Sequence, residues 1–424
     1  MAVGAVVSAA TSAGLVVTDR AGTLGSETVA PSGAVDSTSG LVADLDAVSC
    51  SEGRCEAVGG SFNSFGDLVP VEATVDPTTG AVSVGRPVVP GGGLRDDVAS
   101  LDDVSCPAAG TCFAVGSVVN ASDGYDNGAL VDVLRGGRWR ARLVRLPRDA
   151  QAHGAENLSA ISCVSAAYCV AAGIYDDTAG DQDGLLVTES KGRLQARRAP
   201  LPAGTGPGAD PTLDAVACAP GGGCLVTGEY GPEQIYGGGT GLIEAERGGR
   251  WTASKAPDPP GAGEPARETI WAVSCGSWGR CAAGGTDFEA SGEELGMLLT
   301  ESGARWRAAW APLPPELAGT ENAQVDQIAC ARRRALAASC AATGSDFLAG
   351  GGVEALLYDL SGSKLRVSLA APATGPEGGA SVPDDLSCAE WCLAVGSYTA
   401  PMGRSEAAAW AREPVGDTGR WSPA

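Results

Sequence analysis

Fourteen cysteines fall into seven close pairs, which is the most regular pattern of reactive side chains in this chain of 424 residues. Paired cysteines can form a disulfide, contribute to a four-ligand zinc site or, with a histidine as base, supply a nucleophile. The single histidine, His153, falls in an expected connecting loop and offers no partner to most pairs. The spacing therefore predicts seven disulfides, which form in oxidising compartments. The predicted bonds are Cys50–Cys55, Cys106–Cys112, Cys163–Cys169, Cys218–Cys224, Cys275–Cys281, Cys330–Cys340 and Cys388–Cys392.

Carboxylates form a second group of side chains with chemical potential. The segment DDTAGDQDG, residues 176–184, carries four of them within eight residues. Oxygen ligands at this density suit Ca²⁺, and Asp177, Asp181 and Asp183 are the candidate ligands. A solvated acidic loop is the simpler interpretation of the same residues. Paired carboxylates could also catalyse glycoside hydrolysis, which requires a defined separation across a cleft.

A repeat of about 56 residues positions these side chains. The first cysteines of successive pairs lie 55 to 58 residues apart, an aliphatic residue precedes each by two positions, and a glycine follows each second cysteine by four. Segments such as LDDVSC and CFAVG therefore predict a hairpin. A Gly-rich acidic loop, an apolar third strand such as GLLVTES and a fourth strand such as GGRWRARLVRLP complete each unit.

Four short strands per unit are typical of a β-propeller blade, because one such sheet has two apolar faces that neighbouring sheets must cover. We therefore predict an all-β chain folded as a single β-propeller of four-stranded antiparallel blades. Residues 1–44 match a unit without its first strand and cysteines, which gives eight blade positions with the first incomplete. A seven-bladed ring with the N-terminal strands against its seam is the alternative. The complete blades are expected at 45–100, 101–157, 158–212, 213–269, 270–324, 325–382 and 383–424.

Residues 1–17 are small and apolar, but they lack the basic segment of a signal peptide and match the repeat instead. Because the chain starts inside a blade, we expect a native start and a secretion signal upstream of residue 1. No apolar run reaches the roughly 18 residues that a spanning helix needs.

The formal net charge of −22 argues against a nucleic-acid partner, which would require a basic face. Arginine supplies 26 of the 29 basic residues, a composition typical of high-GC bacterial genomes. Several arginines fall in the expected fourth strands, among them Arg138, Arg140, Arg142 and Arg145. We interpret them as a solvated outer edge that discourages pairing with other chains.

Aromatic residues recur where the second strand of a unit gives way to a loop. Six of them come two or three residues after the glycine of the unit, and one lies further along its loop. Aromatic rings on a rim suit sugars or peptides, whereas packing between blades would place rings at a fixed offset as well. The candidate ligand-binding residues are Phe62, Tyr125, Tyr175, Tyr230, Phe288, Phe347 and Tyr398.

The segments GGRW, GARW and VTESKGRL resemble degenerate versions of the Asp-box, whose pattern is Ser-x-Asp-x-Gly-x-Thr-Trp. Tryptophan keeps its place at Trp139, Trp251, Trp306 and Trp421, whereas the Asp and Thr are missing. With its plan of strands, the unit resembles the sialidase-like and photosystem II assembly-factor-like β-propellers over nearly the whole chain. In that family the Asp-box is a folding element opposite the active site, so the resemblance implies fold rather than activity.

Two functions follow from these observations. The first is a secreted or cell-surface, non-catalytic propeller that recognises an extracellular glycan or protein through its loop face. The alternative is an extracellular sialidase-like glycoside hydrolase or lyase, although the arginine triad, the Tyr/Glu pair and the acid/base residue that the resemblance implies match no positions here. No cofactor is expected apart from calcium in the acidic loop.

Overall fold

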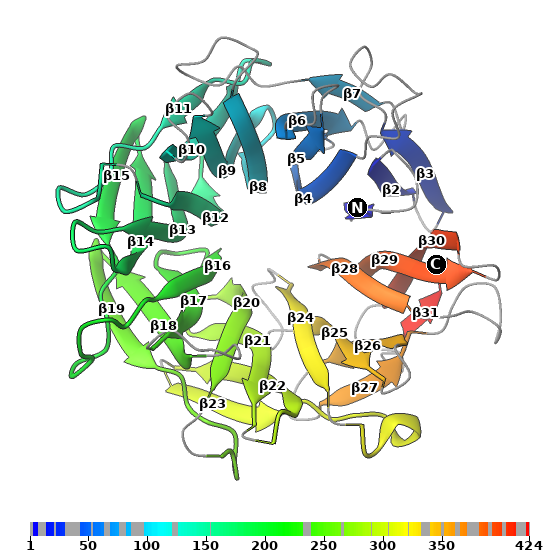
Figure 1. The fold of residues 1–424 in the computed structure, drawn as a ribbon. Helices are drawn as coiled ribbons and strands as arrows, with labels where there is room; N and C mark the ends of the chain where they lie inside the picture. The colour runs from blue at the N-terminus through cyan, green and yellow to red at the C-terminus, as the bar shows by residue number, and fades with distance from the viewer. Residues whose placement is uncertain are drawn as a thin grey trace.

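A computed structural model shows the chain as a ring of β-sheets (Figure 1). For residues 3–45 it describes the course of the strands only. The structure describes residues 3–6, 14–20, 23–29, 43–51, 54–62, 68–75, 82–85, 97–120, 126–152, 154–231, 239–263, 267–289, 291–303, 305–320, 322–331, 340–348, 352–360, 365–370, 381–388, 392–400, 404–412 and 421–423.

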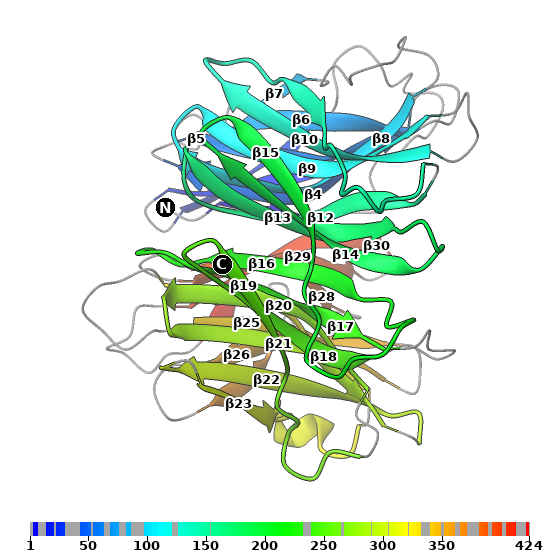
Figure 2. The same ribbon diagram turned by 90° about the vertical axis from the view of Figure 1, so that its left-hand side faces the viewer.

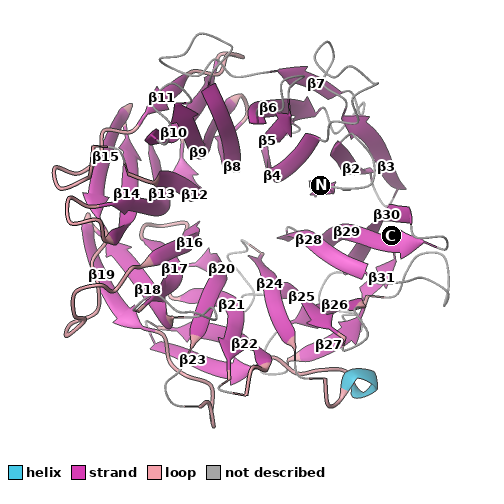
Figure 3. Cartoon of the chain, in the orientation of Figure 1, coloured by secondary structure: helices cyan, strands magenta, loops and turns pink. Residues whose placement is uncertain are grey.

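Within these residues the strands form seven four-stranded antiparallel sheets and one three-stranded sheet, each built from consecutive strands. The described part holds one short 3₁₀ helix, η1 (Pro315–Leu317), and Figure 3 shows strand in every sheet of the ring. The strands are β1 (Val3–Val6), β2 (Gly14–Arg20), β3 (Thr23–Val29), β4 (Ala43–Ser51), β5 (Arg54–Phe62), β6 (Leu68–Val75), β7 (Val82–Gly85), β8 (Asp97–Ala108), β9 (Thr111–Asn120), β10 (Asp126–Arg135), β11 (Ala141–Leu143), β12 (Glu156–Ser165), β13 (Tyr168–Asp176), β14 (Gln182–Ser190), β15 (Arg193–Arg198), β16 (Thr212–Cys218), β17 (Cys224–Tyr230), β18 (Thr240–Arg247), β19 (Arg250–Lys255), β20 (Glu268–Ser277), β21 (Arg280–Phe288), β22 (Glu294–Ser302), β23 (Arg305–Trp310), β24 (Ala323–Cys330), β25 (Cys340–Phe347), β26 (Val353–Asp359), β27 (Arg366–Leu369), β28 (Ser381–Cys388), β29 (Cys392–Ala400), β30 (Arg404–Arg412) and β31 (Trp421–Pro423).

The first strand of each four-stranded sheet lies near the centre of the ring, and the fourth strand lies at its outer edge (Figure 1). First strands of successive sheets contact one another, and β1 contacts both β4 and β28. This arrangement confirms the predicted all-β propeller architecture of four-stranded antiparallel sheets.

The hydrophobic core lies between neighbouring sheets. Phe113 of the β8–β11 sheet packs with Leu158, Tyr175 and Leu185 of the β12–β15 sheet, and all four side chains are buried. The opposite face of the β12–β15 sheet packs on the β16–β19 sheet through Val170 and other apolar side chains. Each sheet thus has two apolar faces covered by its neighbours, as the strand sequences require.

All seven predicted disulfides are present. Most join residues directly opposite each other in the first hairpin of a sheet, such as Cys163 and Cys169. Their Cα atoms lie 4.0 Å apart. The structure has no helix long and apolar enough to span a membrane in the part of the chain that it describes.

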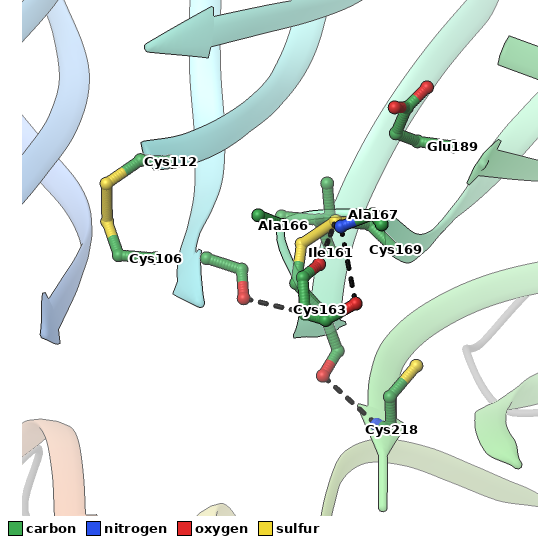
Figure 4. Close-up of a disulfide and its surroundings, with 12 residues drawn as sticks. Cys106, Cys112, Ile161, Cys163, Ala166, Ala167, Cys169, Glu189 and Cys218 are labelled. Carbon is green, nitrogen blue, oxygen red and sulfur yellow. Dashed lines mark hydrogen bonds between the residues drawn. A yellow bond between two sulfur atoms is a disulfide. The ribbon is translucent and has the colours of Figure 1, made fainter. Parts of the chain in front are cut away.

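Serine side chains link the first strands of neighbouring sheets. Ser105 Oγ accepts a hydrogen bond of 3.1 Å from the Cys163 amide, and Ser162 Oγ accepts one of 3.0 Å from the Cys218 amide. Figure 4 shows Cys163 and Cys218 at the ends of these two bonds, beside the Cys106–Cys112 disulfide. The serine is the residue before the first cysteine of a unit, so the same repeat that forms the disulfides also joins the sheets.

Candidate functional site

One face of the ring carries the loops between second and third strands together with the connections between sheets. We call it the loop face. In the β12–β15 sheet, the Thr178 amide donates to the Asp149 carbonyl at 2.8 Å, and the Gln151 amide donates to the Asp176 carbonyl at 2.8 Å. These bonds tie the loop to the preceding connection. Figure 2 shows the strands of the same sheets running between this face and the opposite one.

The predicted aromatic residues differ in accessibility on this face. Phe347 is 40% exposed, and Phe288 on the neighbouring sheet is half-buried. Tyr230 is half-buried and packs on the core between the β12–β15 and β16–β19 sheets. Tyr175 has no exposed surface and belongs to the core. We had predicted Tyr175 as a ligand-binding residue on the loop face. That prediction is wrong, because Tyr175 packs between sheets.

Strand geometry explains this difference. Tyr175 comes two residues after its glycine, whereas Phe288 and Phe347 come three residues after theirs. Phe288 and Phe347 are the last residues of β21 and β25, whereas Tyr175 lies one residue before the end of β13, so the two phenylalanines lie nearer the open end of their sheets. Two residues after the corresponding glycine, the β20–β23 and β24–β27 sheets carry Asp287 and Asp346, which are also buried.

Three predicted aromatics fall wholly or partly outside the described residues. Phe62 lies at the end of β5 and Tyr398 lies in β29, but neither side chain is described. Tyr125 lies outside the described residues altogether, as does His153.

A polar cluster surrounds the buried Tyr175. Its hydroxyl donates to Asp149 Oδ1 at 3.3 Å, and Arg198 pairs with Asp183, Nη2 to Oδ1, at 2.5 Å. Burial raises the pKa of Asp183, while Arg198 works in the opposite direction. Burial also raises the pKa of Tyr175, with help from Asp183 and Asp149. The tyrosine is a neutral donor without access to a substrate, so this cluster holds the connection in place.

Two of the three carboxylates predicted to bind calcium, those of Asp177 and Asp183, have protein partners, whereas Asp181 is exposed. Asp177 Oδ1 accepts from the amides of Ala179 at 2.7 Å and Asp181 at 3.1 Å, which closes the loop. Asp183 is the partner of Arg198. Among the described residues, no group of three or more His, Cys, Asp or Glu side chains is placed to hold a metal ion. The loop is thus ordered by its own amides and by an arginine.

A second acidic cluster lies where the β16–β19 and β20–β23 sheets meet at the loop face. Glu268 and Asp287 are 0% and 2% exposed, and Lys255 pairs with Asp258 at 2.8 Å. Burial raises the pKa of Glu268 to about 8, and Asp258 contributes by sharing a hydrogen bond with it. A carboxylic acid that is neutral near pH 7 could act as a general acid. Glu268 has no exposed surface through which to reach a substrate, so its role is structural.

Aspartates also gather on the first strands, where sequence reasoning had not placed a feature. Each first strand of a four-stranded sheet contains a register shift at the same point. In β12 it falls just before Ala160, which comes three residues before Cys163, and the other first strands match. Burial raises the pKa of Asp103 and of Asp214 to about 7. Asp103 Oδ2 accepts from the Ile161 amide of the next sheet at 2.7 Å. The recurrent Asp before the Val-Ser-Cys segment was the available signal.

The turns between third and fourth strands contain the segments that resemble the Asp-box. Glu189 Oε1 accepts from the Gly192 amide at 2.6 Å, and Glu246 Oε1 accepts from the Gly249 amide. Glu246 stands five residues before Trp251, which is the place of the missing Asp in the pattern. A glutamate thus closes the turn where the Asp-box has an aspartate.

No family model and no curated protein matches the chain. Similar solved structures include a six-bladed fucose-binding lectin from Aleuria aurantia, at 11% identity and a TM-score of 0.36 over 75% of this chain and 91% of that chain. The β-propeller domain of the Trilobed protease from Pyrococcus furiosus is similar at 10% identity and a TM-score of 0.47, over 90% of this chain and 97% of that chain. A puromycin-hydrolysing peptidase from Mycobacterium tuberculosis is similar at 12% identity and a TM-score of 0.47, over 90% of this chain and 52% of that chain. At these identities and TM-scores the likeness says nothing about ligand or activity.

Proposed function

We propose that this chain is a non-catalytic binding propeller that recognises an extracellular glycan or protein through its loop face. The observation that carries the proposal is the pair of accessible rings, Phe288 and Phe347, at equivalent positions of neighbouring sheets. An apolar ring that stays exposed at 40% on a strand end contributes less to folding than a buried ring, and it offers flat contact area to a sugar or a peptide.

The charge of the loop face narrows the ligand class. Asp181 and Asp258 are exposed, and Glu289 and Glu293 are half-buried near Phe288 in sequence. A negatively charged face repels acidic ligands, attracts basic ones and does not repel neutral ones. A neutral glycan or a basic protein segment therefore fits better than an acidic one.

The side chains with shifted pKa values are buried, which favours a binding function over catalysis. Glu268, Asp287 and Tyr175 have shifted pKa values but almost no exposed surface. An extracellular sialidase-like hydrolase or lyase would need its carboxyl groups and arginines open to the substrate. No contact among the described residues favours that alternative over binding.

The disulfides support secretion or display at the cell surface. Seven disulfides persist only where the surroundings are oxidising. We therefore propose that the bacterial cell exports this propeller, and that its partner lies outside the cell.

We further propose that the ring has eight blade positions, the first with three strands. The contacts of β1 with both β4 and β28 support this closure. A seven-bladed ring with β1–β3 packed on its seam is the competing arrangement. Cryo-electron microscopy of particles viewed along the ring axis separates the two: eight angular positions support the proposal, and seven overturn it.

The binding proposal is tested by screening the whole chain on neutral-glycan and peptide arrays, followed by titration of the strongest hit. The double variant Phe288→Ala/Phe347→Ala should weaken binding at least about 30-fold, as expected for two central contacts. The matched control is Leu143→Ala, which removes a side chain of similar exposure, 47%, from the outer strand β11. The proposal is contradicted if both variants lose the same affinity for the ligand, or if the double variant binds it as tightly as wild type.

A further inference from the structure

The outer edge of four consecutive sheets is basic, although the chain as a whole is strongly acidic. Fifteen of the 29 basic residues lie in four segments that contain none of the 51 acidic residues: six in 135–148, four in 190–209, three in 247–257 and two in 302–315. These segments contain the outer strands β11, β15, β19 and β23, which follow one another along one side of the ring (Figure 1). Figure 2 shows that side face on. We call these fifteen residues the arginine belt.

The belt is accessible and mostly without intramolecular partners. All fifteen side chains are exposed. Arg135, Arg198 and Lys255 form ion pairs with acids of the third strands or loops. The other twelve make no ion pair in the part of the chain that the structure describes. Their charges are thus available to a partner.

The belt continues from one sheet to the next. Arg142 Nη1 donates to the Gly192 carbonyl of the next sheet at 3.3 Å. Arg247 lies over the ring of Trp278 in the following sheet, 4.7 Å from its centroid. Trp310 donates to the Pro260 carbonyl at 3.0 Å across the same pair of sheets. These contacts join the first basic segment to the second sheet and the third basic segment to the fourth sheet.

Protection of edge strands explains charge on these strands but not its sign. Charged side chains of either sign discourage pairing with other chains. A chain with more acids than bases would then show both signs on its outer strands. The outer strands of the other sheets carry little charge: none in β7 and β31, one arginine in β27 and one glutamate in β3. Selection of positive charge on one side of the ring requires a negatively charged partner.

We propose that the arginine belt binds a linear anionic polysaccharide bearing carboxylate or sulfate groups. Guanidinium groups pair with such groups in a bidentate manner. Trp139, Trp251 and Trp306 each follow a belt arginine and are half-buried: each packs against the core and keeps some surface that a sugar could contact. A flexible chain can follow the curved outer edge across four sheets, whereas a flat membrane touches a convex edge along a narrow strip.

The test is binding of the whole chain to heparin and to polygalacturonate, which present sulfate and carboxylate respectively. Dextran serves as the neutral polymer. A DNA duplex and vesicles of phosphatidylglycerol and phosphatidylcholine represent other polyanions. Wild type should bind one or both anionic polysaccharides at about 50 mM salt and release them as ionic strength rises. The polymer that binds identifies the preferred group.

The decisive variant is Arg138→Gln/Arg140→Gln/Arg197→Gln/Arg307→Gln, which should bind at least about tenfold more weakly because each charged contact contributes modestly. Arg366→Gln on the outer strand β27 is the matched control and should stay within about twofold of wild type. Phe288→Ala/Phe347→Ala should leave this binding unchanged, which separates it from the loop-face proposal. The proposal is overturned if wild type binds neither polysaccharide or if the belt variant binds as tightly as wild type. It is also overturned if only DNA or vesicles show binding that depends on the belt.

Discussion

The innermost and the outermost strands of the four-stranded sheets carry opposite charge. The seven first strands contain eleven acidic residues and no Lys or Arg, whereas the seven fourth strands contain nine Lys and Arg and no acid. The inner acids are held by the protein: Asp103 accepts two backbone amides, from Val104 and from Ile161 of the next sheet. The outer arginines mostly face solvent.

This difference shows how one repeat serves two purposes. Near the centre, disulfides and serine-to-amide bonds join each sheet to itself and to the next. Burial there raises the pKa of several aspartates, among them Asp103. At the outer edge the side chains have few partners, and their charge can change without loss of packing. The net charge of the chain conceals this separation, because it adds both regions together.

Among variants of the inner and outer strands, the largest stability effect should come from the inner hairpins. Replacing both cysteines in Cys163→Ser/Cys169→Ser should lower the free energy of unfolding by roughly 2–3 kcal/mol, the value for closing a loop of about seven residues. Urea unfolding under non-reducing conditions measures this. The outer-strand variant Arg140→Gln serves as the control and should change stability by less than about 0.5 kcal/mol. Similar costs for both variants would remove the distinction between inner and outer strands.

A pH-dependent effect should come from the inner aspartates. The pKa of Asp214 is raised by burial, and further by Glu229, to about 7. The folded protein therefore holds this proton more tightly than the unfolded chain, whose Asp has a pKa of about 3.9. The resulting stabilisation is complete below about pH 4 and is lost as the pH rises through 7.

The variant Asp214→Asn, which cannot ionise, should thus be more stable than wild type at pH 8, on the order of 1–2 kcal/mol, and show no such gain at pH 4. Thermal melts of both proteins across this range measure the difference. A gain of the same size at pH 4 and pH 8 would show that ionisation of Asp214 costs nothing in the fold.

The smallest effect should come from a single bond between sheets. Ser162→Ala removes the acceptor of the Cys218 amide and should cost about 1 kcal/mol. Ala217 stands where other units have this serine, so Ala217→Ser offers the reverse experiment at the next sheet, with a gain of up to about 1 kcal/mol. Chemical denaturation of the two variants measures whether the free energy of unfolding falls in the first and rises in the second. A neutral Ser162→Ala would mean that these bonds position the sheets without stabilising them.

The sequence was sufficient to predict the hairpins, their disulfides and the propeller architecture, because cysteine, glycine and apolar residues recur at fixed distances. The sheets begin one to four residues before the expected unit boundaries. The burial of each aromatic was not predicted, since Tyr175 and Phe347 were treated as equivalent although Phe347 comes one residue later, at the end of its strand.

Contacts between sheets lay beyond sequence reasoning for a different reason. The bond from the Cys218 amide to Ser162 joins residues 56 positions apart, and only the packing of neighbouring sheets brings them together. The partners of Asp177 and Asp183 were hidden in the same way. A run of carboxylates has the composition of a calcium loop whether its oxygens face an ion, an amide or an arginine.

The most direct test of the account compares ligand binding and thermal stability of two variants, once an array has supplied a ligand. Phe288→Ala/Phe347→Ala should lose binding at least about 30-fold while its melting temperature stays within a few degrees of wild type. Tyr175→Ala should instead lose about 3–5 kcal/mol of stability, because its ring is fully buried. If the double variant unfolds as readily as Tyr175→Ala, or binds like wild type, the loop face is not the binding surface.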